Sequence, residues 1–237
     1  MAKSNQGRVP RWMHADAHRG HLLGGTVRSM TSREDLAALT TDPIAYLDDP
    51  DPEIRRLAVT LATATDPRVD IDDGIVDRLL EMMTADASPR VRAEAAEALG
   101  NTAGDVVEPL LSAASADDAP IVVEAAATAL GEIGDRAAVP WLIDAAAHHP
   151  DRLVREAAVA SLGAIGDERA RITLLDLVAN GPPQIRRRSV AALTVFDGDD
   201  VETALRAALA DRNPMVREAA EMVMGRPVPE AEDGDPS

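Results

Sequence analysis

The sequence contains no cysteine among its 237 residues, which excludes disulfides, thiolate metal sites and cysteine nucleophiles. Aromatic residues make up only 2% of the chain, so a core has to be built from Ala, Leu, Val, Ile and Met. These small or flexible side chains suit closely packed helices better than a β-sandwich, whose strands favour aromatic and β-branched residues. The composition therefore favours an all-α protein.

Positive charge is also scarce, with 24 Lys and Arg residues against 41 Asp and Glu residues and a formal net charge of −17. A surface this acidic repels phosphate backbones and anionic membrane surfaces. Neither a membrane-spanning apolar run nor a signal-peptide core is visible. We therefore expect a cytoplasmic protein that binds neither nucleic acid nor membrane. Lys3 is the only lysine, a bias that fits either a GC-rich coding sequence or a high-salt habitat.

An internal repeat organises most of the chain. Residues 122–135 read VVEAAATALGEIGD, and residues 154–167 read VREAAVASLGAIGD. The apolar residue near the start of each such block serves as an anchor, and the last five anchors are spaced by 31, 32, 31 and 31 residues. In several units a leucine stands eight positions after the anchor and a glycine nine positions after it. The anchors are Ile54, Val91, Val122, Val154, Ile185 and Val216.

Each unit is predicted to form two helices. In the fourth unit Asp135 is placed to cap a first helix, and Pro150 interrupts the chain before a second helix that contains Val154. Both segments place apolar residues at helical spacing. Because a hairpin of two short helices cannot bury both of its faces alone, the units have to stack. The sequence therefore predicts an α-solenoid of about six helical hairpins over residues 31–225.

The block V-R-x-A-A-x-x-(A/S)-L-G-x-(I/L)-G-D resembles the HEAT-repeat family, in its short form of about thirty residues. The resemblance covers roughly residues 35 to 225. It implies a right-handed superhelix whose second helices line the concave face. Because such arrays serve many purposes, the resemblance identifies the fold and leaves the function open.

The family pattern also implies an Asp–Arg ladder, in which an aspartate in the turn between the two helices precedes an arginine of the second helix by six residues. Such a carboxylate accepts N–H groups while the guanidinium bridges to a neighbour. A structural role is the main interpretation of these residues, with a functional arginine patch as the alternative. The sequence predicts ladder pairs at Asp49 and Arg55, Asp86 and Arg92, and Asp211 and Arg217.

The middle of the ladder pattern is irregular. The residues six positions apart there are His149 and Arg155, Asn180 and Arg186, and Asp117 and Val123.

Arginines are concentrated in the fifth unit, which reads QIRRRSV. Arg187 occupies a position that holds glutamate in three other units. Arg187 and Arg188 either dock an acidic partner segment or neutralise neighbouring acids. The same face is expected to present a shallow strip of small or apolar residues, six positions after their anchors, as further candidate partner contacts. These are Thr128, Ala160, Ala191 and Met222.

Residues 1–30 and 226–237 lie outside the repeat. The first segment is predicted to be a flexible arm, and its histidines His14, His18 and His21 would share one face of a helix. Imidazoles at this spacing are weak candidates for a Zn²⁺ or Ni²⁺ site. The second segment is proline-rich and acidic, and we expect a disordered tail.

Catalytic proteins with similar repeats provide the alternatives. The chain has no His-Glu dipeptide, which argues against a di-iron enzyme of the deoxyhypusine hydroxylase type. A bilin-lyase-like protein, or another accessory subunit of an enzyme complex, remains an alternative, because its repeat residues are not distinctive. The sequence favours a monomeric, non-catalytic scaffold that needs no cofactor and binds a protein or peptide on its concave face.

Overall fold

The computed structural model describes residues 33–64, 73–102 and 105–225, so the predicted arm, its three histidines and the predicted tail lie outside the described residues. Within these ranges all regular elements are helical. The first helices of the units are α1 (Arg33–Thr41), α3 (Asp73–Ala85), α5 (Val107–Ala116), α7 (Val139–His148), α9 (Arg171–Asn180) and α11 (Asp199–Ala208). The second helices are α2 (Pro52–Thr63), α4 (Pro89–Gly100), α6 (Pro120–Ile133), α8 (Arg152–Ile165), α10 (Pro183–Ala192) and α12 (Pro214–Met224).

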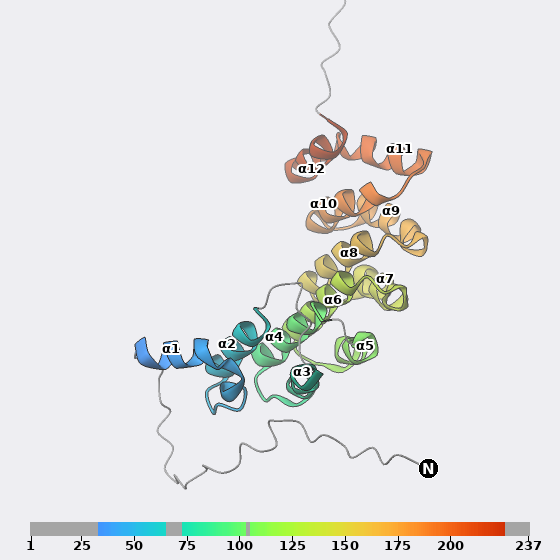
Figure 1. The fold of residues 1–237 in the computed structure, drawn as a ribbon. Helices are drawn as coiled ribbons and strands as arrows, with labels where there is room; N and C mark the ends of the chain where they lie inside the picture. The colour runs from blue at the N-terminus through green and yellow to red at the C-terminus, as the bar shows by residue number, and fades with distance from the viewer. Residues whose placement is uncertain (1–32, 65–72, 103–104, 226–237) are drawn as a thin grey trace, which may run out of the picture.

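These helices form six hairpins that stack into a curved solenoid, as the repeat predicts (Figure 1). The even-numbered helices lie side by side along the inner, concave side of the curve, while α5, α7, α9 and α11 lie on its outer side. Short 3-10 turns precede or follow several helices, and they are η3 (Pro43–Tyr46), η4 (Arg136–Ala138), η5 (Glu168–Ala170) and η6 (Leu193–Val195).

Local sequence signals set the ends of the helices. Five of the six second helices have proline in their first turn, where the missing N–H removes no intrahelical hydrogen bond. The exception is α8, where the Asp151 side chain accepts the N–H groups of Leu153 and Val154 instead. Gly134 and Gly166 end α6 and α8 with positive φ angles of 75° and 64°. A left-handed residue of this kind favours glycine and stops the helix.

The core is one continuous cluster of aliphatic side chains that extends from the first hairpin to the last. All six anchors are buried, and five of them are fully inaccessible to solvent. The largest fully buried side chains are mostly leucine, while alanines fill the gaps between helices. Small side chains allow short interhelical distances, which explains how a chain with so few aromatics builds a closed interior.

The glycines that stand nine positions after the anchors lie where successive second helices come closest. A Cβ atom on Gly131 would collide with the Ser161 Oγ and lie 2.8 Å from the Ser161 Cα. A Cβ on Gly100 would meet the Ala129 Cα at 2.8 Å, and one on Gly163 would meet the Ala192 Cα at 2.8 Å. Each glycine therefore makes room for the backbone of the next unit.

Replacing Gly131 by Ala forces α6 and α8 apart, because the obstacle includes backbone atoms of Ser161. We expect the free energy of unfolding to fall by about 2 kcal/mol, measured by urea denaturation. Gly134→Ala is the matched control, since its Cβ meets nothing within 4 Å and only the positive φ of 75° opposes it. That strain costs about 1 kcal/mol. A Gly131→Ala variant as stable as the wild type would contradict the close approach.

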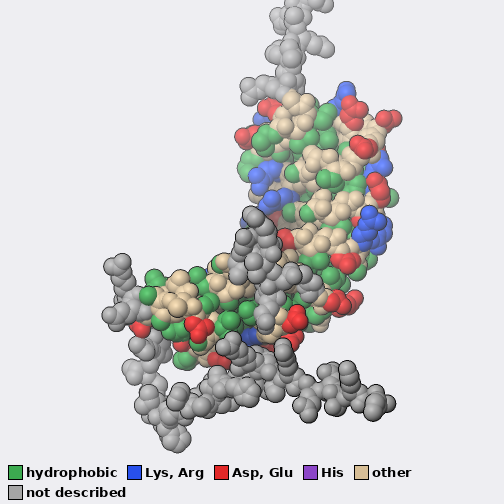
Figure 2. Space-filling model, viewed as in Figure 1, with side chains coloured by type: hydrophobic (Ala, Val, Ile, Leu, Met, Phe, Trp, Pro, Cys, Tyr) green, Lys and Arg blue, Asp and Glu red, His purple; other side chains and the backbone are tan. Residues whose placement is uncertain are grey.

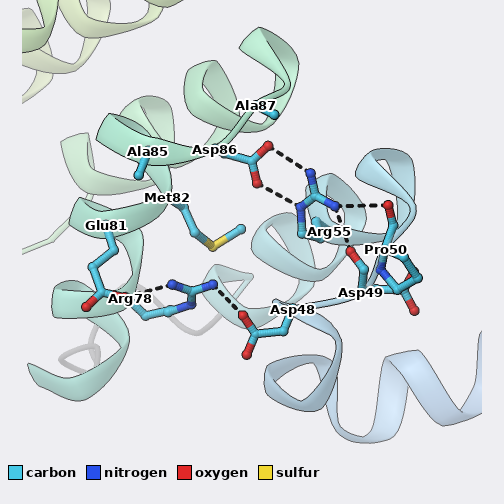
Figure 3. A pocket seen from close by; sticks show the side chains of 10 residues that line it. All are labelled: Asp48, Asp49, Pro50, Arg55, Arg78, Glu81, Met82, Ala85, Asp86 and Ala87. Atoms are coloured by element: carbon cyan, nitrogen blue, oxygen red, sulfur yellow. Dashed lines mark hydrogen bonds and ion pairs between the residues drawn. The ribbon is translucent and has the colours of Figure 1, made fainter. Parts of the chain in front are cut away.

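The Asp–Arg ladder joins successive units along the edge formed by the inter-helix turns. Arg55 donates from Nε and Nη2 to the two carboxylate oxygens of Asp86 in the next unit, at 2.7 and 2.8 Å (Figure 3). Its Nη1 donates to the main-chain oxygen of Asp49 at 2.6 Å. The carboxylate of Asp86 also accepts the N–H of Ser88 at 2.8 Å, so one aspartate orders its own turn and binds the previous unit.

Two further rungs have the same geometry. Arg92 holds Asp117 through Nε and Nη2 at 2.7 and 2.9 Å, and Arg186 holds Asp211 at 2.8 and 2.7 Å. The sequence pattern compared residues six positions apart within a unit and therefore found no charged pair for Asp117 or Arg186. In the structure the ion pairs run between units, because the guanidinium takes only a main-chain oxygen from its own turn.

The ladder is interrupted in the middle of the solenoid. Between α6 and α8 the arginine is replaced by the buried Val123, and His149 stands in for the aspartate by accepting the Asp151 N–H on Nδ1 at 3.1 Å. In the next rung Arg155 faces Asn180 in place of an aspartate and donates to the main-chain oxygen of Ala146 at 3.0 Å.

Replacing Arg92 by Met removes the cation of one rung but keeps most of the side-chain volume. Asp117, whose side chain is 11% exposed, is left with its Ala119 N–H and no cation. We expect the free energy of unfolding at neutral pH to fall by about 2–3 kcal/mol, because a carboxylate removed from water loses its partner. Arg90→Met on the same helix is the matched control: that side chain is 69% exposed, so the change stays below about 0.5 kcal/mol. Equal losses in the two variants would contradict the role of the rung.

The same rung makes stability depend on pH. The hydrogen bond from Arg92, assisted by the Ala119 N–H and opposed by burial, holds the pKa of Asp117 below its ordinary value of 3.8. The folded state therefore binds fewer protons than the unfolded state, and the stabilisation is lost as pH falls through the folded pKa. We expect the stability difference between wild type and Arg92→Met to shrink as pH is lowered from about 5 to about 2. A difference that stays constant in urea titrations over this range would be inconsistent with the lowered pKa.

Candidate functional site

The concave face carries the predicted strip of small and apolar residues. Thr128 on α6, Ala160 on α8, Ala191 on α10 and Met222 on α12 are all exposed, and Met222 is 78% exposed. The Thr128 hydroxyl donates to the main-chain oxygen of Glu124, so it presents no free donor. The strip can therefore contribute a smooth surface for close approach, with Met222 as its one large apolar side chain.

Charged side chains border this strip in a regular arrangement, which we call the inner charge row. It consists of the residues two and three positions after each anchor. The residue three positions after one anchor faces the residue two positions after the anchor of the preceding unit. Arg56 on α2 thus pairs with Glu94 on α4 at 3.1 Å. In the same register Arg188 on α10 lies 4.0 Å from Glu156 on α8.

Glu156 is the most buried carboxylate of the row. It is 8% exposed and also pairs with Arg152 one turn before it on α8. The predicted docking residue Arg188 is thus partly neutralised by Glu156, as one of the two sequence interpretations proposes. Arg152 and Arg188 keep side-chain exposures of 56% and 45%, which leaves donors facing solvent.

Arg187 differs from its neighbours because the facing position in the next unit is Ala219. Within the described part of the chain it has no ion pair, and its Nε is buried without a hydrogen-bond partner. Figure 2 shows basic side chains on the concave side at the level of α10. The structure therefore places an unneutralised guanidinium beside Ala191 on the strip.

Glu124 on α6 is the acidic counterpart, since its facing position on α8 is Ala157. Its carboxylate has no hydrogen bond or ion pair among the described residues, although its backbone oxygen accepts from Thr128. Burial raises the pKa of Glu124, and the negative charges of Asp151 and Glu156 raise it further. The site therefore has an excess of negative charge that a cation would relieve.

A shallow depression of about 610 Å³ lies over α2, α4 and α6 on this face and reaches Glu124 and Thr128. Glu97 on α4 also lines it. Glu132 on α6 has a raised pKa, first through burial and then through the charge of Glu97. The half of the concave face nearer the N-terminus is thus acidic, while α8 and α10 carry exposed arginines.

A second depression, of about 480 Å³, lies at the ladder edge between the first turn and α3 (Figure 3). Its charged side chains already have partners: Arg55 binds Asp86, and Arg78 pairs with Asp48 and Glu81 at 2.5 and 2.7 Å. Such a closed set of ion pairs fits a structural role better than ligand binding.

The described residues contain no group of three His, Asp or Glu side chains placed to hold a metal ion. None of the described helices combines the length and apolar character that crossing a bilayer requires. The weak metal candidates His14, His18 and His21 lie outside the described residues.

Sequence reasoning selected Arg187 and missed Glu124. The sequence contained the signal. A charged residue two positions after one anchor stays unpaired when alanine stands three positions after the next anchor. This comparison requires the register between stacked helices, which one unit taken alone does not contain.

Solved structures of other helical repeat proteins resemble this fold. The complex of CpcE and CpcF of phycocyanin lyase from Nostoc sp. PCC7120 includes a chain with 25% identity and a TM-score of 0.54, covering 65% of this chain and 99% of that chain. The YibA protein of Escherichia coli has 18% identity and a TM-score of 0.59, covering 84% of this chain and 77% of its own. A designed armadillo repeat protein in complex with the peptide (KR)4 has 17% identity and a TM-score of 0.53, covering 78% of this chain and 98% of its own.

The family comparison agrees with the stacked hairpins. No curated protein matches the sequence. A family model for HEAT repeats matches residues 40–122 and 107–194, which together span more than half of the chain. The protein belongs to the HEAT-repeat family.

Proposed function

We propose that the protein is a non-catalytic scaffold that binds a partner protein or peptide on its concave face. The observation that carries this proposal is the unpaired Arg187 beside the exposed Ala191, in the strip that also contains Ala160. A solenoid spreads contacts over many units, so shape and a few charged anchors suffice for binding. The ladder arginines, by contrast, are held in structural ion pairs.

The similar structures support a protein or peptide as the partner. One of them is a complex of two proteins, and another is a repeat protein in complex with a peptide. Because the latter shares only 17% identity with this chain, it supports the fold and not the peptide sequence.

The second candidate is an accessory subunit of a bilin-lyase-like complex. It is favoured by the match to a phycocyanin lyase chain, which this chain covers over 99% of its length. Such a role also requires protein association, so both candidates use a binding surface. They differ in whether a pigment accompanies the protein.

Affinity capture with the purified protein as bait tests the proposal. We expect the proteins identified by mass spectrometry with wild-type bait to fall at least about fivefold with Arg187→Glu plus Arg188→Glu, because reversing both charges repels an acidic partner. Arg206→Glu plus Arg212→Glu, on α11 and the turn after it, is the control and should retain them. Thermal unfolding midpoints close to that of wild type exclude a folding defect.

Capture that both double variants leave unchanged would contradict binding on the concave face. A co-purifying pigment, detected by visible absorbance and lost with the same charge reversal, would instead favour the accessory-subunit role.

A further inference from the structure

We call a position of the inner charge row closed where its charge is paired across units, and open where the charge has no partner among the described residues. The two open positions carry opposite charges. The row is closed where Arg56 meets Glu94 and where Glu156 meets Arg188. Where one member is alanine, the charge on the other side stays unpaired.

Arg187 is the open basic position. Its Nε is buried without an acceptor, but the side chain as a whole is only half-buried, and a carboxylate that reaches its terminal nitrogens forms a strong charge-assisted hydrogen bond. Ala219, the facing residue on α12, has no acceptor in its side chain. Glu218, beside it, is exposed and makes no ion pair with Arg187. Among the described residues no carboxylate pairs with Arg187, so its charge is available to an acidic group of another molecule.

Glu124 is the open acidic position, to which a basic group can bind. It lies at the edge of the depression over α2, α4 and α6. Arg56 and Arg90, the cations lining that depression, both pair with Glu53, and Arg56 also pairs with Glu94. The carboxylates of Glu97 and Glu124 are left without a cation from the described residues. A basic side chain entering the depression would meet both.

The two open positions lie two units apart, on α6 and α10. Neighbouring packed helices have axes about 8–10 Å apart, so the two positions are separated by roughly 20 Å. An extended chain advances about 3.3–3.6 Å per residue, so about six residues bridge that distance. One turn further along the helices, the exposed Ala160 on α8 and Ala191 on α10 carry only methyl groups, so an extended backbone can lie over them.

The geometry points to an extended peptide segment as the occupant, with a basic side chain on Glu124 and an acidic side chain about six residues away on Arg187. This inference rests on the proposed function and adds the charge pattern of the partner. The chain direction stays free, because either end of the segment can supply either charge.

A display library of random twelve-residue peptides, panned on the full-length protein, tests the pattern. With wild type we expect enriched peptides to pair a basic with an acidic residue at a spacing of about six. Arg187→Glu makes both positions acidic and should shift enrichment to two basic residues. Glu124→Lys should shift it to two acidic residues. Arg206→Glu, on the outer helix α11, is the control and should leave the wild-type pattern unchanged.

Binding constants of the most enriched peptide, measured by fluorescence anisotropy, complete the test. We expect either charge reversal to weaken binding roughly three- to tenfold, and the effect to decrease at high salt. Peptides without the pattern, or a pattern unaffected by both reversals, would overturn the inference.

The blocking variant Ala160→Trp plus Ala191→Trp separates this inference from the proposed function. If it abolishes binding of peptides that lack the charge pattern, the concave face is a binding surface and only the pattern is wrong. If enriched peptides bind the blocked protein as well as wild type, both proposals fail.

Discussion

The close backbone approach of successive second helices is the constraint on which the solenoid depends. Glycine at the end of α4, α6 and α8 lets the next helix approach so closely that a single Cβ would collide with its backbone. With aromatic residues at 2%, few bulky side chains are available to fill a wider gap. Small residues therefore fix the distance between units, and that distance brings the ladder and the inner charge row into register.

Much of the fold could be predicted from the sequence because the anchors repeat with a nearly constant period. The period gives six hairpins, and Pro and Gly mark where helices begin and end. Contacts between units were harder to predict. Asp117 was compared with Val123 in its own unit, whereas its guanidinium partner is Arg92 in the unit before. A pattern within one unit cannot reveal a pair whose members belong to different units.

The candidate site illustrates the same limit. The unusual charge of Arg187 was visible because glutamate occupies its position in three other units. Its importance in the structure comes from Ala219, a residue that draws no attention in the sequence. Glu124 looked ordinary for the same reason, since only the facing Ala157 leaves it unpaired. On this surface the small residues decide which charges remain available to a partner.

The interrupted ladder has a mechanical consequence. Between α6 and α8 the turn edge has no ion pair, yet the Ser161 hydroxyl still donates to the main-chain oxygen of Ala127 at 2.8 Å. The two helices are thus joined by packing and a hydrogen bond along their length, but no ion pair joins them at the turn edge. At this junction the superhelix is therefore held together by packing and one neutral hydrogen bond, without the ion pair that the turn edge supplies near both ends of the solenoid.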